Sequence, residues 1–234
     1  MIGEFSAVLE ECTTIEAVRT LFKERIASFG YTASACGAFL PTDKGPETHF
    51  FFQDWPPDWI ELYARRNFVA ADYVVAEARR RIAPFTWLEA KAERILSRAE
   101  QDIWDTAAEW GWTDGFSVPI HGPGGYFGLV AMAGKERPVP SALRRELHQL
   151  SFLTHERCRT LTGVAPVADP QATLTHRELE CARWVAAGKT DAAIATLLGV
   201  SQTTVRSHID QARRKLGART RAQAIARLVF SGLS

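Results

Sequence analysis

Several features that assign proteins to a class are missing from this chain of 234 residues. No apolar run approaches the length of a membrane span, and no basic segment followed by an apolar stretch opens the sequence. The four cysteines lie far apart without the spacing of a zinc site, and the six histidines do not cluster. We therefore expect a soluble cytoplasmic protein with reduced, mostly buried thiols, no metal site and no membrane contact.

A strong overall charge is missing as well, because the formal net charge is only +1. The charges are nevertheless unevenly divided along the chain. Residues 173–234 contain ten lysines and arginines against four acidic residues, whereas residues 1–172 contain eighteen against twenty-three. A basic segment joined to a mildly acidic one is typical of a DNA-binding module attached to a domain with a different task.

A change of composition marks the boundary between the two segments. Residues 163–172, with the sequence GVAPVADPQA, contain two prolines, one glycine and small residues but no apolar periodicity, as a linker does. We therefore expect an N-terminal domain at residues 1–162 and a C-terminal DNA-binding domain at residues 173–234. With 46% hydrophobic residues, the chain has enough apolar side chains for two cores.

Three short helices separated by tight turns are predicted near the C-terminus. The first begins at the capping box of Thr175 and Glu178 and ends before Gly188, which suits a left-handed backbone. Thr190 caps the second helix, and Ser201 caps the third. Helix, glycine-containing turn and helix is the arrangement that sets a recognition helix into the major groove of double-stranded DNA.

The N-terminal domain alternates helical and strand patterns. We expect, in chain order, a helix at 5–29, strands at 33–40 and 49–53 around a turn at 41–46, a helix starting at Pro57, a helix at 72–80 capped by Asp72, a helix from Ser97 to about Trp110, a hairpin of strands at 115–120 and 126–133, and a helix at 140–161. Antiparallel strands with helices on both sides make an α-β-α sandwich. The predicted fold class is an α+β domain, able to hold a small molecule, followed by an all-α helix-turn-helix domain.

Short motifs in the C-terminal domain resemble those of a known family. The sequences LTHRE at 174–178, GKT at 188–190 and SQTTVRSH at 201–208 are similar to the LuxR/GerE type of helix-turn-helix. A response regulator can carry the same helix-turn-helix. Its receiver domain, however, has an acidic phosphoacceptor after a strand, and the sequence has no such pattern.

The N-terminal domain resembles the acyl-homoserine-lactone-binding domain of LuxR-type quorum-sensing receptors. The residues that carry this resemblance are Trp59, Tyr63, Asp72, Pro84, Phe85, Trp87, Gly115 and the strand Val118-Pro119-Ile120. The resemblance implies a ligand-responsive transcriptional regulator of quorum sensing and not an enzyme. It also implies a homodimer on a palindromic operator, contact with RNA polymerase, and an N-acyl-homoserine lactone as small-molecule effector, with no cofactor.

The side-chain types at these positions suit the groups of an acyl-homoserine lactone. An indole N–H only donates, so Trp59 suits the lactone carbonyl, and a carboxylate only accepts, so Asp72 suits the amide N–H. Trp55 stands where most relatives have tyrosine, and its indole can donate to the acyl carbonyl. The expected ligand-binding residues are Trp55, Trp59, Tyr63, Asp72, Trp87, Ile103, Ala107, Trp112, Gly115, Ser117 and Ala131.

Departures from the family pattern concern the acyl group. Tyr73 replaces the proline usual after the aspartate, and Ala131 stands where many relatives have serine or threonine. Together with bulky Trp55 and an aromatic-rich wall, these residues favour a short, branched or aromatic acyl group over a long straight chain. An alternative is a receptor of the same build that senses a non-lactone small molecule.

A different use of the N-terminal pocket would be catalysis. No nucleophile–base pair, metal cluster or phosphate loop in the sequence supports an enzyme, and Asp72 has no companion acid. Trp59 and Tyr63, one helical turn apart, could also be ordinary core residues, and Asp72 could be only a helix cap. The joint pattern of matching residues, in order and at family spacing, favours ligand binding.

The C-terminal domain carries the residues expected to meet DNA. They are Lys189, Thr190, Ser201, Thr203, Thr204, Arg206, Ser207, Asp210, Arg213 and Arg214. Arg206 is expected to read a guanine through a bidentate bond, with a phosphate contact as the alternative. Arg213 and Arg214 suit phosphates, and Asp210 either accepts from a cytosine amine or orients Arg206.

One recognition helix reads too few base pairs for specificity, so a dimer is expected. Two surfaces could form the contact between its chains. The helix at 140–161 presents a leucine stripe that could equally be a core face, and the last helix, at 221–230, presents a second stripe. The residues concerned are Leu143, Leu147 and Leu150 in the first, and Ala224, Ile225, Leu228 and Val229 in the second.

Overall fold

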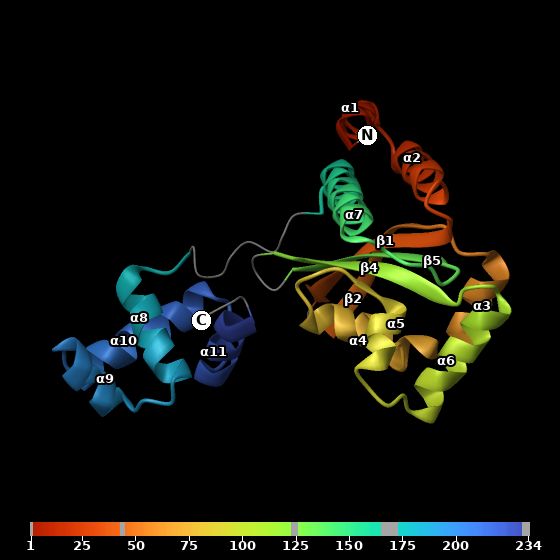
Figure 1. The fold of residues 1–234 in the computed structure, drawn as a ribbon. Coiled ribbons are helices and arrows are strands. Elements are labelled where there is room, and N and C mark those ends of the chain that lie inside the picture. Colours follow the sequence, from red (N-terminus) through yellow and green to blue (C-terminus); the bar gives the residue numbers. More distant parts are fainter. Residues whose placement is uncertain (1, 43–44, 123–125, 165–172, 231–234) are drawn as a thin grey trace. The chain divides into compact units, whose positions relative to one another are not determined.

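The structure, a computed structural model, describes residues 2–42, 45–122, 126–164 and 173–230. Figure 1 shows its helices and strands. The chain divides into two compact units, residues 1–121 with 127–164, and residues 165–234 with the short segment 122–126. Of the linker expected at 163–172, only Gly163 and Val164 belong to the described residues.

A five-stranded antiparallel sheet with the strand order β2-β1-β5-β4-β3 forms the middle layer of the first unit. The strands are β1 (Tyr31–Thr42), β2 (Gly45–Gln53), β3 (Phe85–Thr86), β4 (Asp114–His121) and β5 (Phe127–Gly134). The first two strands extend further than expected and include four residues of the turn predicted at 41–46, while residues 43–44 lie outside the described residues. β4 and β5 are buried at nearly every position because both faces of the sheet are covered.

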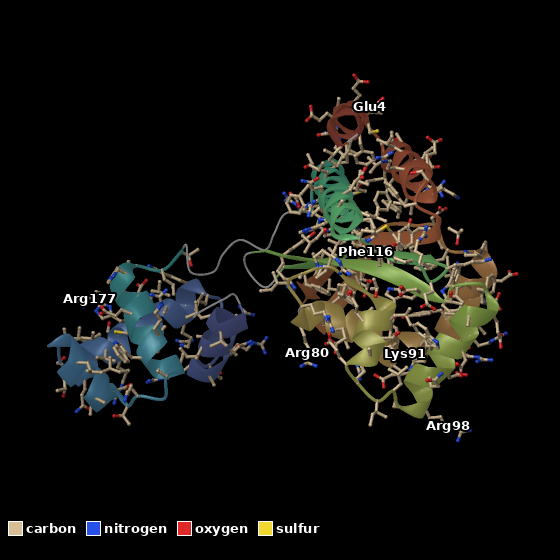
Figure 2. All side chains as sticks on the ribbon, in the orientation of Figure 1. Glu4, Arg80, Lys91, Arg98, Phe116 and Arg177 are labelled. Carbon is tan, nitrogen blue, oxygen red and sulfur yellow. The ribbon has the colours of Figure 1, made fainter. Side chains whose placement is uncertain are left out.

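Helices cover both faces of this sheet (Figure 1). One layer contains α1 (Ile2–Glu11), α2 (Ile15–Ala27) and α7 (Ser141–Thr162). The opposite layer contains α3 (Pro57–Arg65), the 3-10 helix η1 (Phe68–Ala70), α4 (Tyr73–Arg80), α5 (Trp87–Ala92) and α6 (Arg98–Glu109). Figure 2 shows side chains filling the space on both sides of the sheet. The predicted α-β-α sandwich is confirmed.

Side-chain caps start the helices that border the functional site. The Asp72 carboxylate accepts from the backbone N–H of Val74 at 2.8 Å and thereby starts α4. Ser97 and Glu100 form the predicted capping box of α6, and Pro57 lies in the first turn of α3. These caps satisfy backbone amides that the first helical turn leaves free, and they fix where each helix begins.

Two local predictions for the first unit are wrong. The single helix expected at 5–29 is two helices, because Thr14 starts α2 by accepting from the backbone N–H of Ala17 at 3.2 Å. The sequence analysis also did not predict β3 and α5, which are only two and six residues long. The capping box of Thr86 and Glu89 was the available signal for α5.

Within its described residues the second unit consists of four helices, namely α8 (His176–Ala186), α9 (Asp191–Leu198), α10 (Gln202–Lys215) and α11 (Arg221–Phe230). Thr175, Thr190 and Ser201 cap the first three as predicted, each accepting from a backbone amide at 3.0–3.3 Å. Gly188 has the predicted left-handed backbone, with a φ angle of 79°, and Gly199 also has a left-handed backbone, with a φ angle of 65°. The helix-turn-helix of α9 and α10 is therefore confirmed.

Both candidate dimer stripes lie largely in hydrophobic cores. Leu147 and Leu150 of α7 are fully buried within the first unit. Ala224 and Leu228 of α11 are buried in the second unit, in one cluster with Leu216. These residues cannot contact a second copy without unfolding. The large apolar residues that stay exposed on the described parts of these two helices are Phe152 and Val229.

The four cysteines are free thiols and all are buried, as the sequence predicts. None of the helices within the described ranges is long and apolar enough to cross a membrane.

Candidate functional site

A cavity of about 400 Å³ lies between the sheet and the helices α3, α4 and α6. Side chains of β1 and β5 form its floor, and side chains of the helices form its roof. The lining residues are Ala35, Gly37, Phe39, Thr48, Phe50, Gln53, Trp55, Trp59, Ile60, Tyr63, Ala64, Val69, Asp72, Tyr73, Val74, Val75, Trp87, Ile103, Trp104, Ala107, Leu129 and Ala131. This volume and the mostly apolar wall are typical of a small-molecule site.

The cavity brings together most of the ligand-binding residues predicted from the sequence. Those that line it are Trp55, Trp59, Tyr63, Asp72, Trp87, Ile103, Ala107 and Ala131. The other three, Trp112, Gly115 and Ser117, do not line the cavity but lie behind its wall. Their contacts show that they hold the lining tryptophans in place.

Trp87 is fixed by the two predicted residues that lie behind it. Its indole Nε1 donates to Ser117 Oγ at 3.0 Å, so this N–H is not free for a ligand. A Cβ atom on Gly115 would lie 2.3 Å from Cε2 of the same indole. Gly115 therefore leaves the space that the Trp87 ring occupies, and Ser117 sets its orientation.

Tryptophans gather at one end of the cavity. The ring of Trp59 packs edge-on against Trp112 at a centroid distance of 5.0 Å, and Trp55 packs against Trp112 at 5.1 Å. Trp112 Nε1 donates to Thr32 Oγ1 at 3.2 Å, away from the cavity. Within the described residues, the indole N–H groups of Trp55 and Trp59 have no protein acceptor. Both are therefore donors available to a bound molecule.

Asp72 and Tyr63 form a polar corner in the cavity. The Tyr63 hydroxyl donates to Asp72 Oδ2 at 2.7 Å, and Oδ1 accepts from the backbone amides of Val74 and Val75. Burial raises the pKa of Asp72, while these hydrogen bonds favour its carboxylate. Burial and the neighbouring carboxylate raise the pKa of Tyr63 well above its ordinary value, so its hydroxyl stays a donor. Oδ2 accepts one hydrogen bond and can accept a second from a ligand.

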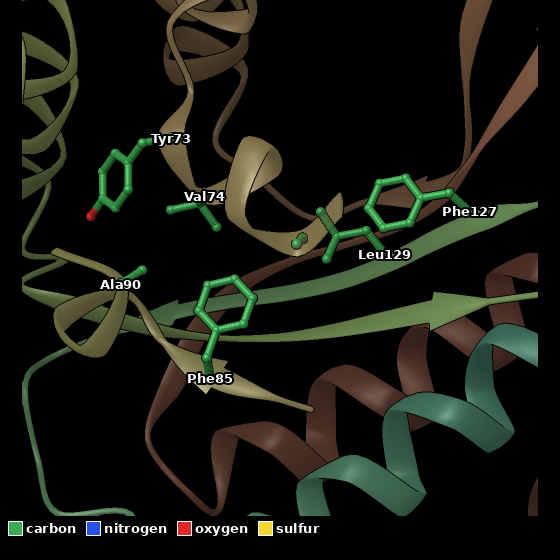
Figure 3. Close-up of a cluster of buried hydrophobic side chains, with 7 residues drawn as sticks. Tyr73, Val74, Phe85, Ala90, Phe127 and Leu129 are labelled. Atoms are coloured by element: carbon green, nitrogen blue, oxygen red, sulfur yellow. The ribbon is translucent and has the colours of Figure 1, made fainter. Parts of the chain in front are cut away.

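The opposite end of the cavity is apolar. Val74 and Leu129 line the cavity and, with Phe127, belong to the cluster of buried side chains in Figure 3. Phe39 packs against this cluster, and its ring stacks on Phe127 at a centroid distance of 4.9 Å. Arg79 of α4 covers both rings, with its guanidinium carbon 4.4 Å from the centroid of Phe39. Phe39 is the lining residue of β1 furthest along the strand from Ala35, and we call its stack with Phe127 and Arg79 the end wall.

The sequence analysis missed most of the floor and the end wall. In β1, the lining residues Ala35, Gly37 and Phe39 are alternate positions on one face of the strand. In β5, Leu129 lies two residues from Ala131, which was predicted. Strand periodicity extended from Ala131 would have found Leu129. The floor of β1 carries no polar residue that could have marked it as a site.

The exposed face of α10 carries half of the residues predicted to meet DNA. Thr203, Arg206, Ser207, Asp210 and Arg214 are exposed, whereas Val205 and Ile209 are buried. The hydroxyl groups of Thr204 and Ser201 are 2.8 Å apart and take part in the helix cap. Lys189 and Thr190 are exposed at the start of α9. Most of the residues predicted to meet DNA are thus exposed.

Acidic partners hold two of these arginines. Arg206 Nε donates to Asp191 Oδ2 at 3.4 Å, whereas Arg213 Nε donates to Asp210 Oδ1 at 3.4 Å. Of the two roles considered for Asp210, orienting Arg206 is therefore not what the structure shows. Asp191, which the sequence analysis did not single out, is the residue that contacts Arg206.

An ion pair between the buried Glu178 and the exposed Lys215 ties the first helix of the second unit to α10. Glu178 accepts from Lys215 Nζ at 2.7 Å and from the backbone N–H of Thr175 at 2.7 Å. Burial opposes ionisation of Glu178, but these donors hold the pKa below its ordinary value. In the described part of the chain, no group of three or more histidine, cysteine, aspartate or glutamate side chains could hold a metal ion.

Both units match known protein families. Residues 14–158 match the family described as Autoinducer binding domain, and residues 172–228 match bacterial regulatory proteins of the luxR family. The quorum sensing-dependent transcriptional regulator RpaR of Rhodopseudomonas palustris is 33% identical over 93% of this chain and 88% of its own length. The transcriptional activator protein AhyR of Aeromonas hydrophila is 32% identical over 87% of this chain and 80% of its own length.

Solved structures share the fold. Escherichia coli SdiA has a TM-score of 0.64 with 23% identity, covering 96% of this chain and 94% of that one. CepR2 from Burkholderia cenocepacia, an N-acylhomoserine lactone dependent LuxR family factor, has a TM-score of 0.56 with 17% identity. It covers 69% of this chain and 96% of its own. At these identities the likeness concerns the fold alone.

Proposed function

Because this chain belongs to the LuxR family of autoinducer-binding and DNA-binding transcriptional regulators, we propose that its effector is an N-acyl-homoserine lactone bound in the cavity of the first unit. The observation that carries this proposal is the polar corner in an otherwise apolar cavity. There the Asp72 acceptor shares the cavity wall with the unpaired indole donors of Trp55 and Trp59.

Each polar group of the lactone has a complementary partner at this end. Trp59 donates to the lactone carbonyl, Trp55 donates to the acyl carbonyl, and Asp72 Oδ2 accepts from the amide N–H. The acyl group then extends over the small residues Ala35 and Ala131, which face each other across β1 and β5, toward the end wall. Polar groups would be satisfied at one end and apolar surface buried at the other.

A non-lactone effector is the second candidate. SdiA, which shares the fold, has been solved in complex with octanoyl-rac-glycerol at 22% identity and a TM-score of 0.62. A promoter-reporter strain carrying this chain separates the two candidates when it receives a panel of acyl-homoserine lactones and monoacylglycerols. We expect a response to a lactone at concentrations where monoacylglycerols have no effect. A response to monoacylglycerols alone would favour the second candidate.

The end wall supports the proposal that the acyl group is short, branched or aromatic. From Ala35 to Phe39, β1 advances about 13 Å, and the Phe39 ring fills the last part of that length. We expect Phe39→Ala to shift the preference toward longer straight chains, because it removes the ring that stops the acyl group. Reporter dose–response curves for acyl chains of increasing length measure this shift.

Ile60→Ala is the matched control for this prediction, because Ile60 is a half-exposed lining residue that is not part of the end wall. It should leave the length preference unchanged. A wild-type protein that prefers twelve-carbon chains, or a length shift produced by Ile60→Ala in place of Phe39→Ala, would contradict the assignment of the end wall.

The C-terminal helix-turn-helix is proposed to read a palindromic operator with Arg206 and to hold phosphates with Arg214. Arg206→Ala should relax the preference at one base pair per half-site, a loss of about 1–3 kcal/mol of discrimination. Arg214→Ala should weaken binding to all sequences alike and flatten the salt dependence. Binding titrations on operator variants at several salt concentrations measure both effects. An equal loss on every operator variant for Arg206→Ala would mean a phosphate contact.

A homodimer is proposed as the DNA-binding form, since two half-sites are needed for specificity. Analytical ultracentrifugation of the effector-loaded protein with a palindromic duplex should give two protein chains per duplex. A complex of one chain per duplex would exclude this form. The buried residues Leu147, Leu150, Ala224 and Leu228 are not available for its contact surface, whereas Val229 is exposed.

The remaining parts of the proposal follow from the regulator role. We propose domain limits at 1–162 and 173–234 with a linker at 163–172, action in the cytoplasm, and contact with RNA polymerase. The protein acts through binding and needs neither a catalytic group nor a cofactor.

A further inference from the structure

Asp191 has both carboxylate oxygens engaged by arginines from two other helices. Oδ1 accepts from Arg221 Nη1 at 2.7 Å, and Oδ2 accepts from Arg206 Nε at 3.4 Å. The Asp191 side chain is 15% exposed, whereas the Arg206 side chain is 68% exposed. Arg206 is therefore an exposed side chain attached to a largely buried anchor. We propose that Asp191 is a positioning residue that holds the Arg206 guanidinium for base readout, an inference that rests on the proposed DNA-reading function.

Asp191 contacts the Arg206 guanidinium through its Nε atom and not through the two Nη atoms at its outer end. Because Nε is bonded to Asp191, both Nη atoms of Arg206 can still donate to O6 and N7 of a guanine. A free arginine has many rotamers, and their loss opposes binding. An arginine already fixed by a carboxylate loses less on contact with the base.

Asp191 is itself held in place from two directions. It is the first residue of α9, where the helix dipole favours a negative charge, and Arg221 at the start of α11 binds it more closely than Arg206 does. Burial opposes its ionisation, but the hydrogen bonds and charges of Arg221 and Arg206 keep its pKa below the ordinary value. The carboxylate is thus a fixed anion beside the expected DNA surface.

The Asp191 carboxylate should lower the affinity for DNA in general and raise the specificity for the right base. It repels DNA phosphates of any sequence, and so it weakens all binding. It also fixes the one arginine expected to read a base, and so it sharpens the preference for the right base. Asp191→Asn should therefore raise the affinity for unrelated DNA while it lowers discrimination at the base pair that Arg206 reads.

The experiment uses the full chain with its effector and an operator selected from a random DNA library by the wild-type protein. Affinities are measured on this operator, on all single-base variants and on unrelated DNA. Asp191→Asn should reduce discrimination at one base pair per half-site about two- to fivefold, the range expected for a surface ion pair. It should bind unrelated DNA more tightly than the wild type. Asp191→Glu, which keeps the charge, should recover most of the discrimination.

Glu180→Gln is the matched control, because Glu180 is a partly exposed acid on α8 that pairs with Arg177 and not with Arg206. It removes one negative charge from the second unit and should leave base discrimination unchanged. In an Arg206→Ala background, Asp191→Asn should have no further effect on discrimination. Thermal unfolding of each variant shows whether the second unit stays folded.

Two results would overturn the inference. If Asp191→Asn lowers the affinity for all DNA without a change in base preference, Asp191 is only a structural contact between helices. If Asp191→Asn sharpens the preference, the carboxylate competes with DNA for Arg206. Failure of the proposed base reading is a separate result, because Arg206→Ala itself would then leave discrimination unchanged.

Discussion

Asp72→Asn is expected to abolish the response to effector while the first unit stays folded. The Asp72 carboxylate is the acceptor proposed for the ligand amide, and loss of a hydrogen bond to a charged group weakens binding by about 1.5–3 kcal/mol, or roughly 10- to 150-fold. An asparagine N–H₂ group at the Oδ2 position would also face the ligand N–H, which adds repulsion. The fold survives because asparagine caps helices as well as aspartate does, so Val74 and Val75 keep their acceptor.

Dose–response curves in a reporter strain, together with circular dichroism of the purified variant, measure this effect. Trp59→Phe is the companion variant: it removes one donor and should weaken the response by about 1–3 kcal/mol without loss of the ring. Asp72→Ala should lower stability as well, because α4 loses its cap. A folded Asp72→Asn protein with wild-type sensitivity would remove Asp72 from the ligand site.

Gly115→Ala is expected to destabilise the first unit strongly and to destroy the ligand site. The new methyl group would lie 2.3 Å from the Trp87 ring and 2.6 Å from the backbone oxygen of Met132. Neither neighbour can withdraw easily, since Ser117 holds the Trp87 indole and Met132 belongs to β5. Overpacking of this kind costs about 1–3 kcal/mol and occasionally more, and here we expect the upper end.

Thermal unfolding of Gly115→Ala and Gly3→Ala provides a matched comparison. Gly3 lies in α1, and a Cβ there would meet no atom within 4 Å. Gly3→Ala should therefore be neutral or slightly stabilising. If Gly115→Ala were as stable as Gly3→Ala and kept its effector response, the close packing of Trp87 on β4 would not be needed for the site.

Helix starts could be predicted from the sequence because each depends on a few neighbouring residues. Ser97 with Glu100 and Thr175 with Glu178 form capping boxes, which depend on local sequence and not on the rest of the fold. The break between α1 and α2 has an equally local cause in Thr14, but an apolar stripe on both sides concealed it. A two-residue strand such as β3 is set by its partner β4, which no local pattern reveals.

The polar residues of the candidate site could be predicted, whereas much of its apolar surface could not. Asp72 and Trp59 have chemistry that few core positions require. Ala35 and Gly37 became part of the floor because β1 lies beside β5, a long-range pairing. Gly115 and Ser117 had been grouped with the lining residues, and only the structure shows that they act through Trp87. Asp191 was missed for the same reason, since Arg206 lies fifteen residues away in the chain.

The most direct test of the account is an equilibrium titration of the purified full chain with a panel of N-acyl-homoserine lactones. Each lactone is compared with its ring-opened acid, for the wild type and for Asp72→Asn. We predict that the wild type binds an intact lactone, that Asp72→Asn binds it at least about tenfold more weakly, and that the ring-opened acid binds poorly because its carboxylate would enter an apolar cavity near Asp72. Equal binding of lactone and acid, or equal binding by wild type and Asp72→Asn, would contradict the proposed ligand site.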